Sequence, residues 1–145
     1  MPPLKPARIY WDSDVALSYF SKYPGRLSDL QTILAEVRSS QESFKIVTSV
    51  LTKAEVAYIA EEKTAPADYP HVEADLDEFW ANTRMVELIE VNEDVATEAR
   101  GLIRTAFLNG WRRLSANDAI HLGTAIWVMK QCRGRRFSYI QYPRF

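Results

Sequence analysis

A short hydrophobic run that ends in two acidic residues constrains the fold of this chain more than any other feature. Residues 9–11 are typical of a buried β-strand, and Asp12 and Asp14 follow them at once. An apolar helical pattern begins immediately after these acids. In open α/β sheets, sites form in the crevice beyond the carboxyl ends of the strands. We therefore predict that Asp12 ends a strand and belongs to a functional site.

The rest of the chain alternates between strand patterns and helix patterns. Apolar, β-rich runs predict strands over residues 8–11, 44–48, 85–91 and 137–142. Two helical patterns separate each strand from the next, and we expect helices over residues 15–20, 28–37, 50–63, 71–83, 93–108 and 116–131. The expected N-cap residues include Asp14, Thr48 or Ser49, Asn92 and Ser115. This alternation predicts an α/β fold in which helices cover both faces of a parallel sheet.

The composition is ordinary for a soluble globular protein, with 47% hydrophobic and 26% charged residues. The 145 residues are enough for a buried core, and we predict one domain over residues 1–145. No apolar run approaches the roughly 20 residues that span a bilayer, and the N-terminus lacks the apolar core of a signal peptide. The only cysteine is Cys132, which excludes a disulfide framework. Together these features predict a cytoplasmic protein.

The charges are distributed unevenly along the chain. Residues 112–145 contain seven basic residues and one acid, Asp118, although the net charge of the whole chain is −1. A basic segment attracts polyanions such as nucleic acids. A solvated basic surface without a ligand is the simpler interpretation, so charge alone identifies no partner.

Two more acids fall on helix faces that the apolar pattern marks as buried. Glu55 shares a face with Tyr58 and Ile59, and Asp118 continues, one turn earlier, an apolar stripe that extends to Met129. An unpaired buried carboxylate is costly. Several carboxylates that share a cation avoid this cost, and oxygen ligands suit Mg²⁺ or Mn²⁺. Asp12, Glu55 and Asp118 are therefore candidate ligands of one ion.

Each of these acids also has an ordinary structural interpretation. Asp12 and Asp14 can cap the first helix, and Asp118 lies in a first turn, where the helix dipole favours a negative charge. Glu55 can pair with a lysine or an arginine. Taken singly, every residue keeps both interpretations, whereas three inward acids at strand and helix ends favour a shared site.

Three segments around these acids together resemble the PIN-domain family, and within it the VapC-type toxin ribonucleases of toxin–antitoxin pairs. They are IYWDSDV at residues 9–15, TSVLTKAE at residues 48–55 and SANDAIHLGTA at residues 115–125, in the order of the family. The resemblance implies an α/β/α sandwich around a central parallel sheet. It also implies a homodimeric endoribonuclease that hydrolyses RNA phosphodiesters with Mg²⁺ or Mn²⁺ and is neutralised by a small antitoxin protein.

The resemblance assigns roles to the three acids. By motif match, Asp12, Glu55 and Asp118 correspond to acids of the family, and we expect them to be both the metal ligands and the catalytic residues. The ion would polarise the scissile phosphate and lower the pKa of a bound water. Glu55 would orient or deprotonate that water before it attacks in line.

The sequence departs from the family pattern near its C-terminal end. The family usually has a fourth acid after the last motif, but no Asp or Glu follows Asp118, and Gln141 stands at the expected position. The chain also ends before a further helix and strand that are common in the family, so the sheet is expected to lack the last strand. A reduced enzyme, an inactive relative and an atypical C-terminus are the alternatives that remain open.

Several other side chains have a functional and a structural interpretation. His121 lies one helical turn after Asp118, and a packed histidine bonded to the backbone or to Asp118 is favoured over a general base. Ser13 and Ser49 can bind a phosphate, but as turn and cap residues they need no ligand. The four tryptophans can stack on bases, and residues 112–113, both arginine, can contact an RNA backbone.

Two other functions compete with the ribonuclease hypothesis. The first is a PIN-fold protein that binds RNA or an antitoxin without cleaving RNA, which the missing fourth acid favours. The second is a phosphatase similar to the haloacid dehalogenases, with Asp12 as nucleophile, Asp14 as its neighbouring acid, and Thr48 or Ser49 as the phosphate-binding hydroxyl. The sequence lacks the late acidic pair that such a phosphatase requires.

Overall fold

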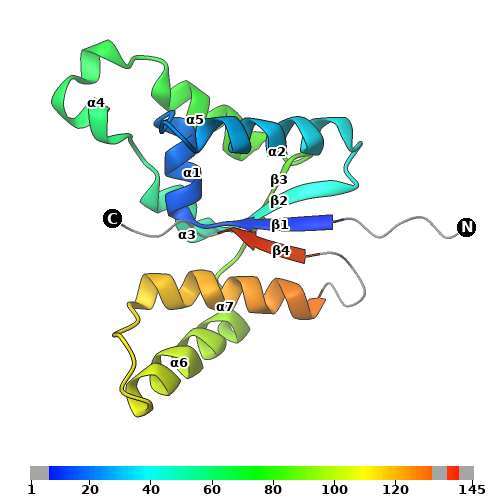
Figure 1. Cartoon of the computed structure of the whole chain (residues 1–145), viewed down its shortest axis with the longest axis vertical. Coiled ribbons are helices and arrows are strands. Elements are labelled where there is room, and N and C mark those ends of the chain that lie inside the picture. The colour runs from blue at the N-terminus through cyan, green and yellow to red at the C-terminus, as the bar shows by residue number, and fades with distance from the viewer. Residues whose placement is uncertain (1–6, 132–136, 141–145) are drawn as a thin grey trace, which may run out of the picture.

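The computed structural model describes residues 7–131 and 137–140, which form a four-stranded parallel sheet with helices on both faces (Figure 1). The strands are β1 (Ala7–Trp11), β2 (Phe44–Ser49), β3 (Val86–Ile89) and β4 (Phe137–Ile140). Their order across the sheet is β3-β2-β1-β4, and every neighbouring pair is parallel. The predicted parallel sheet is therefore confirmed, with each strand within two residues of its expected position.

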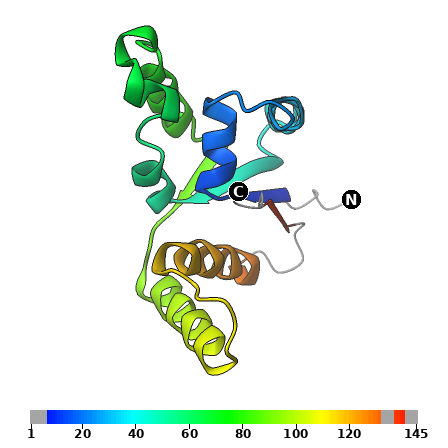
Figure 2. The ribbon, with the colours of Figure 1, turned by 60° about the vertical axis from the view of Figure 1, so that its left-hand side comes forward.

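Helices connect the strands, because parallel neighbours need crossover connections. They are α1 (Ser13–Phe20), α2 (Leu27–Ser39), α3 (Val50–Glu55), α4 (Ala60–Thr64), the 3-10 helix η1 (Pro66–Asp68), α5 (Val72–Ala81), α6 (Glu93–Leu108) and α7 (Ala116–Gln131). Helices α1, α2 and α5 cover one face of the sheet and α7 covers the other (Figure 1). Figure 2 shows that α6 lies on the side of α7 that faces away from the sheet. The fold is thus the predicted α/β/α sandwich, with α6 added outside it.

The helix expected over residues 50–63 is interrupted. It ends at Glu55, and Val56 adopts φ −108 and ψ 61, outside the helical region, before α4 begins at Ala60. The interruption brings Val56 and Ile59 into the core, where they are 1% and 4% exposed. The prediction of one continuous helix is wrong here, because burial of two β-branched residues outweighs the continuation of a short helix.

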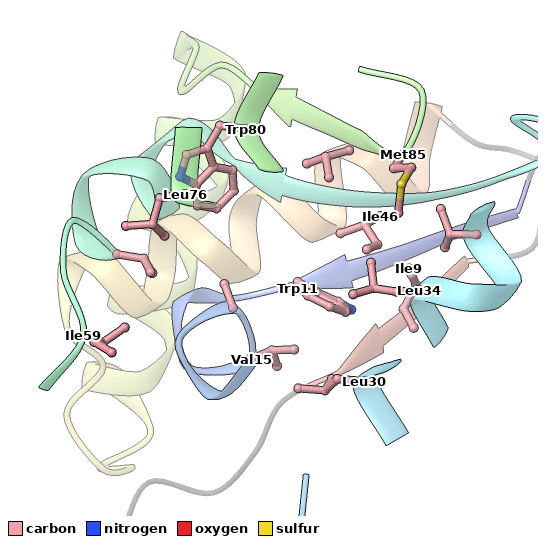
Figure 3. Close-up of a cluster of buried hydrophobic side chains, with 14 of the residues drawn as sticks. Ile9, Trp11, Val15, Leu30, Leu34, Ile46, Ile59, Leu76, Trp80 and Met85 are labelled. Carbon is pink, nitrogen blue, oxygen red and sulfur yellow. The ribbon is translucent and has the colours of Figure 1, made fainter. Parts of the chain in front are cut away.

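Alternation along β1 sends its side chains to opposite faces of the sheet. Ile9 and Trp11 join the larger core beneath α1, α2 and α5, which includes Leu30 and Trp80 (Figure 3). In this core the ring of Trp11 stacks on Phe79 at 6.1 Å between centroids. Apolar burial of this kind stabilises a domain by roughly 25 cal/mol for each Å² removed from water.

The opposite face of the sheet has a smaller core beneath α7. It contains Tyr10, Val47 and Ile89 from the strands, with Ala125 and Val128 from α7. The other side of α7 packs closely on α6. A Cβ atom added to Gly123 would lie 3.0 Å from the carbonyl oxygen of Val95, so the two helix backbones approach each other here.

No helix among the described residues is long and apolar enough to cross a membrane. Gln141, which we expect at the position of the family's fourth acid, lies outside the described residues. Cys132 also lies outside them, as do four of the seven basic residues of the C-terminal segment, namely Arg133, Arg135, Arg136 and Arg144.

Candidate active site at the carboxyl edge of the sheet

Asp12 directly follows β1 and begins α1. The residue is 6% exposed, and its Oδ1 accepts a hydrogen bond of 3.0 Å from the backbone N–H of Val15. Asp12 is therefore the N-cap of α1, whereas Asp14, the cap that we expected, lies inside the first turn. Capping satisfies a backbone donor that the helix leaves unpaired. It also orients the Asp12 carboxylate at the carboxyl end of β1.

Glu55 is the last residue of α3, the short helix that follows β2. Ser49 caps this helix by accepting a hydrogen bond of 3.1 Å from the N–H of Leu51. The predicted apolar face around Glu55 is wrong in one respect, since Tyr58 is 51% exposed once the helix has ended. The Glu55 side chain is nonetheless 20% exposed, because it contacts α7 rather than its own helix face.

Glu55 is bonded to a buried histidine. Its Oε1 lies 2.5 Å from Nε2 of His121, and Nδ1 of the same imidazole lies 3.0 Å from the hydroxyl of Tyr10. The sequence favours a packed His121 that is bonded to the backbone or to Asp118. The prediction that His121 is packed is confirmed, and the predicted bonding partner is wrong. Tyr10 was not considered. Tyr10 lies between Ile9 and Trp11 in β1, and because successive side chains of a strand point to opposite faces, Tyr10 faces α7.

Asp118 lies in the first turn of α7 and is partly buried. Ser115 caps this helix as predicted, because its Oγ accepts a hydrogen bond of 3.2 Å from the N–H of Asp118. The apolar stripe expected to extend to Met129 is wrong, since Met129 is 51% exposed. The buried residues of α7 are Ala119, His121, Gly123, Thr124, Ala125 and Val128. The difference arises because α7 is covered on two sides, by the sheet and by α6.

These three acids come from elements that meet at one edge of the sheet. In Figure 1 the start of α1, the helix α3 and the first turn of α7 all lie at the end towards which the strands point. Asp12 follows β1, Glu55 ends the helix after β2, and Asp118 precedes by one turn the histidine that binds Glu55. The elements that carry the three acids therefore meet at the carboxyl edge of the sheet, as the sequence predicts.

The chemistry of the three carboxylates suits a hard divalent cation, which prefers oxygen ligands. Their present arrangement is less favourable. Within residues 7–131 and 137–140, no three Asp, Glu, His or Cys side chains are placed so that they could hold one metal ion. Oε1 of Glu55 is engaged by His121, and Oδ1 of Asp12 caps α1. The residue types fit a cation, but the three carboxylates would have to move closer together to bind one.

A second hydrogen-bonded group joins β1 to β2 near the same edge. The Thr48 hydroxyl donates to the carbonyl oxygen of Trp11 at 2.6 Å and lies 2.7 Å from the Thr52 hydroxyl. Both threonines are buried. The sequence predicts Thr48 only as a helix cap or a phosphate ligand. It does not reveal the hydrogen bond by which Thr48 joins the two strands. Its effect is to fix the strand end that carries Asp12.

Few of the proposed RNA-binding residues remain available on the surface. Trp11 and Trp80 are buried, and Trp127 packs against the smaller core. Trp111 is 64% exposed. It stands beside residues 112–113, both exposed arginines, in the segment that precedes α7. Among the described residues that we proposed for RNA binding, those in this segment are therefore the ones available for stacking or phosphate contacts.

An apolar groove lies between α6 and the first turns of α7. It has a volume of about 540 Å³, and its lining includes Ile103, Phe107 and Ile120 together with Arg100 and Arg104. The Phe107 side chain in this groove is 74% exposed. Among the described residues, α6 packs mainly on α7.

Comparison with known proteins places the chain in a family. The model of the PIN domain matches residues 9–127, which include all three acids. This chain belongs to the PIN-domain family, as the three motifs predicted. PIN domains are generally nucleases that use divalent metal ions.

The chain is also similar to a solved structure, that of VapBC2 from Rickettsia felis bound to a DNA fragment from their promoter. The identity is 15%, the match covers 92% of this chain and 98% of that chain, and the TM-score is 0.55. At this identity the likeness shows a common fold. No curated protein matches the sequence.

Proposed function

We propose that this chain is a metal-dependent endoribonuclease and the toxin of a toxin–antitoxin pair. Membership of the PIN family supports nuclease chemistry in general. The observation that carries the more specific proposal is the bond between Glu55 and His121. It joins α3 to the first turns of α7, and so brings Glu55 to the edge where Asp12 and Asp118 also lie.

In this proposal Asp12, Glu55 and Asp118 are the ligands of Mg²⁺ or Mn²⁺. The ion, when bound, supplies Lewis-acid chemistry at the scissile phosphate. Asp12 is oriented for binding by its cap to Val15. Glu55 accepts a hydrogen bond from the attacking water and takes its proton. Exposed arginines at residues 112–113 hold the RNA backbone beside this edge.

The direct test is cleavage of RNA by the purified protein with Mg²⁺ or Mn²⁺, with and without EDTA. Asp12→Asn should lower the rate by about 10²-fold or more, because several kcal/mol of charge stabilisation is lost. Asparagine caps a helix as well as aspartate does, so the variant should keep its fold. Asp29→Asn is the matched control, since Asp29 is an exposed acid in the first turn of α2. Equal cleavage by all three proteins would refute the proposal.

A non-catalytic PIN-fold protein that binds RNA or an antitoxin is the second candidate. It is favoured by the spacing of the carboxylates and by the absence of any Asp or Glu after Asp118 in the sequence. Calorimetric titration with Mn²⁺ separates the two candidates. Binding that is lost in Asp12→Asn supports the enzyme, and no binding at millimolar Mn²⁺ supports the non-catalytic protein. The phosphatase hypothesis is set aside, because the chain belongs to another family.

We further propose that residues 1–145 form one domain and that the protein acts in the cytoplasm, where its RNA substrate is. We also propose that a small antitoxin protein neutralises it. The structural similarity to a VapBC complex supports the last point. The experiment is co-expression with any small protein encoded by the adjacent reading frame. The antitoxin should co-purify with this chain and suppress RNA cleavage, and a neighbour that does neither argues against the pairing.

A homodimer is the remaining part of the proposal, and the surface that favours it consists of exposed apolar residues at the end of α6 and shortly after it. Phe107, Leu108 and Trp111 are 74%, 66% and 64% exposed. Apolar residues exposed next to one another commonly mark an interface. Phe107→Glu should convert a dimer into a monomer in light scattering, whereas Thr105→Glu, at an exposed polar position of the same helix, should not. A wild-type monomer at high concentration would contradict this assignment.

A further inference from the structure

A chain of hydrogen bonds runs from β1 through α7 to the candidate catalytic edge. The Tyr10 hydroxyl lies 3.0 Å from Nδ1 of His121, and Nε2 of His121 lies 2.5 Å from Oε1 of Glu55. Tyr10 is 0% exposed and His121 is 2% exposed. The inner end of the chain is thus enclosed, and only its outer end, the Glu55 carboxylate, is within reach of solvent.

The roles of the atoms in the outer bond follow from their chemistry. An ionised carboxylate only accepts hydrogen bonds, so Nε2 of His121 must carry the proton that it shares with Glu55. This holds for the singly and the doubly protonated imidazole alike. A hydrogen bond to an ionised partner is shorter and roughly twice as strong as a neutral one. The bond therefore holds the Glu55 side chain more firmly than an ordinary contact would.

Glu55 would lack such an anchor within its own helix. It is the last residue of α3, and the chain leaves the helical conformation at Val56. A glutamate there has many side-chain rotamers, and restricting it to one of them costs conformational entropy. Within the described part of the chain, Oε1 of Glu55 is hydrogen-bonded to His121. The second oxygen, Oε2, accepts no hydrogen bond from any described residue.

We propose that His121 is a positioning residue for Glu55, held in turn by Tyr10. It binds one carboxylate oxygen and leaves the other for the water or ion at the edge of the sheet. The consequence for cleavage rests on the proposed ribonuclease function, whereas the bond itself does not. Glu55 then reaches the site from a fixed position, and His121 acts through it without touching the substrate.

The bond can be tested by NMR, because the chain contains only two histidines, His71 and His121. In protein labelled with ¹⁵N in the histidine side chains, the Nε2–H of His121 should give a downfield proton resonance that exchanges slowly with water. His71 has a side chain that is 57% exposed and should give none. Glu55→Gln should move the resonance upfield, since a neutral amide is a weaker acceptor than a carboxylate. Absence of the resonance, or no change in Glu55→Gln, would overturn the inference.

Cleavage assays test whether the position of Glu55 matters. His121→Leu should lower kcat by about 10–100-fold, the usual effect of removing a residue that orients a site ligand. The KM for RNA should change little. His121→Gln should retain most of the activity, because its amide nitrogen reaches about as far as Nε2 and still donates. Thr124→Val is the control, since Thr124 is a buried polar residue one turn further along α7 and bonds only its own helix.

The two experiments separate the possible failures. Equal kcat for His121→Leu and wild type, or equal losses for the leucine and glutamine variants, would overturn the positioning role. If the leucine variant does not fold, the NMR comparison of wild type with Glu55→Gln still decides on the bond. A wild-type protein that shows the resonance but cleaves no RNA would refute the proposed function and leave the bond in place.

Discussion

The two faces of the central sheet are built from different kinds of residue. The face beneath α1, α2 and α5 is buried by large apolar side chains such as Trp11, Leu30 and Trp80. The face beneath α7 has a smaller apolar cluster, and buried polar residues, among them Tyr10 and His121, lie beside it. Neighbouring residues of β1 thus serve opposite faces. The difference shows that one strand can contribute to the main core and to the candidate site at the same time.

The difference has a physical reason. A buried polar group is tolerated only if it is hydrogen-bonded, so polar side chains gather where they can bond one another. Tyr10, His121 and Glu55 do this on one face, whereas aliphatic side chains on the other face, such as Leu30, need no such partners. We therefore expect substitutions on the first face to change mainly stability, and those on the second to change mainly activity.

The largest effect on stability is expected from Leu30→Ala. Leu30 is 0% exposed in the main core, and its truncation should lower the free energy of unfolding by about 2–5 kcal/mol through lost burial and the remaining cavity. Urea denaturation measures the loss. Gln31→Ala, at the adjacent exposed position of α2, should leave the free energy almost unchanged. RNA cleavage by the folded Leu30→Ala protein should stay near the wild-type rate, and a selective loss of activity would break the comparison.

A smaller effect is expected from Gly123→Ala, which tests the packing of α7 on α6. The new Cβ would meet backbone atoms of Val95 and Ala99 at 3.0 and 3.1 Å, and such overpacking destabilises by about 1–3 kcal/mol. Gly101→Ala in α6 is the matched control, because its Cβ would meet nothing within 4 Å. That variant should gain about 0.5–1 kcal/mol from helix propensity. Thermal denaturation should therefore show shifts of opposite sign, and shifts of the same sign would mean that the helices are not in close contact.

Tyr10→Phe should have a modest effect on both properties. The variant keeps the ring in the core and removes one hydrogen bond to His121, which costs about 1 kcal/mol. Cleavage should fall by about tenfold or less, and therefore less than in His121→Leu, because the bond from His121 to Glu55 remains. Urea denaturation and single-turnover cleavage measure the two changes. A loss of activity as large as that of His121→Leu would show that Tyr10 has a more direct role.

The smallest effect is expected from Lys130→Met. The ion pair between Lys130 and Glu98 has an N–O distance of 2.6 Å and links α7 to α6, but the Lys130 side chain is 59% exposed. Exposed pairs contribute about 0–1 kcal/mol. Chemical denaturation in low and high salt should show a difference of that size, and smaller in high salt. A larger loss would mean that charge, rather than the contact at Gly123, holds α6 in place.

The sequence was sufficient for the sheet, most helices and the family, because these depend on local periodicity and on motifs. Asn92 illustrates this, since it caps α6 as predicted by accepting a hydrogen bond of 2.9 Å from Val95. The location of Asp12 and Asp118 at a strand end and a helix start was predictable for the same reason. Their roles as metal ligands and catalytic residues stay predictions.

The remaining features depend on contacts between distant segments, which no local pattern contains. The partner of His121 is Glu55, 66 residues earlier, and neither residue signals the other. The end of α3 at Glu55 reflects burial of Val56 in the tertiary core. The exposure of Phe107 and Met129 depends on which sides of α6 and α7 are covered, and their helical spacing alone cannot reveal it.

The pairing of β1 with β4 has a consequence for synthesis on the ribosome. Arg8 pairs with Phe137, and Tyr10 with Tyr139, so the first strand gains its second neighbour only after residues 137–140 have emerged. Tyr10 meets His121 across a separation of 111 residues. Contacts this far apart in sequence form late and slow folding. A nascent chain therefore cannot assemble the proposed site until α7 has been synthesised and has emerged from the ribosome.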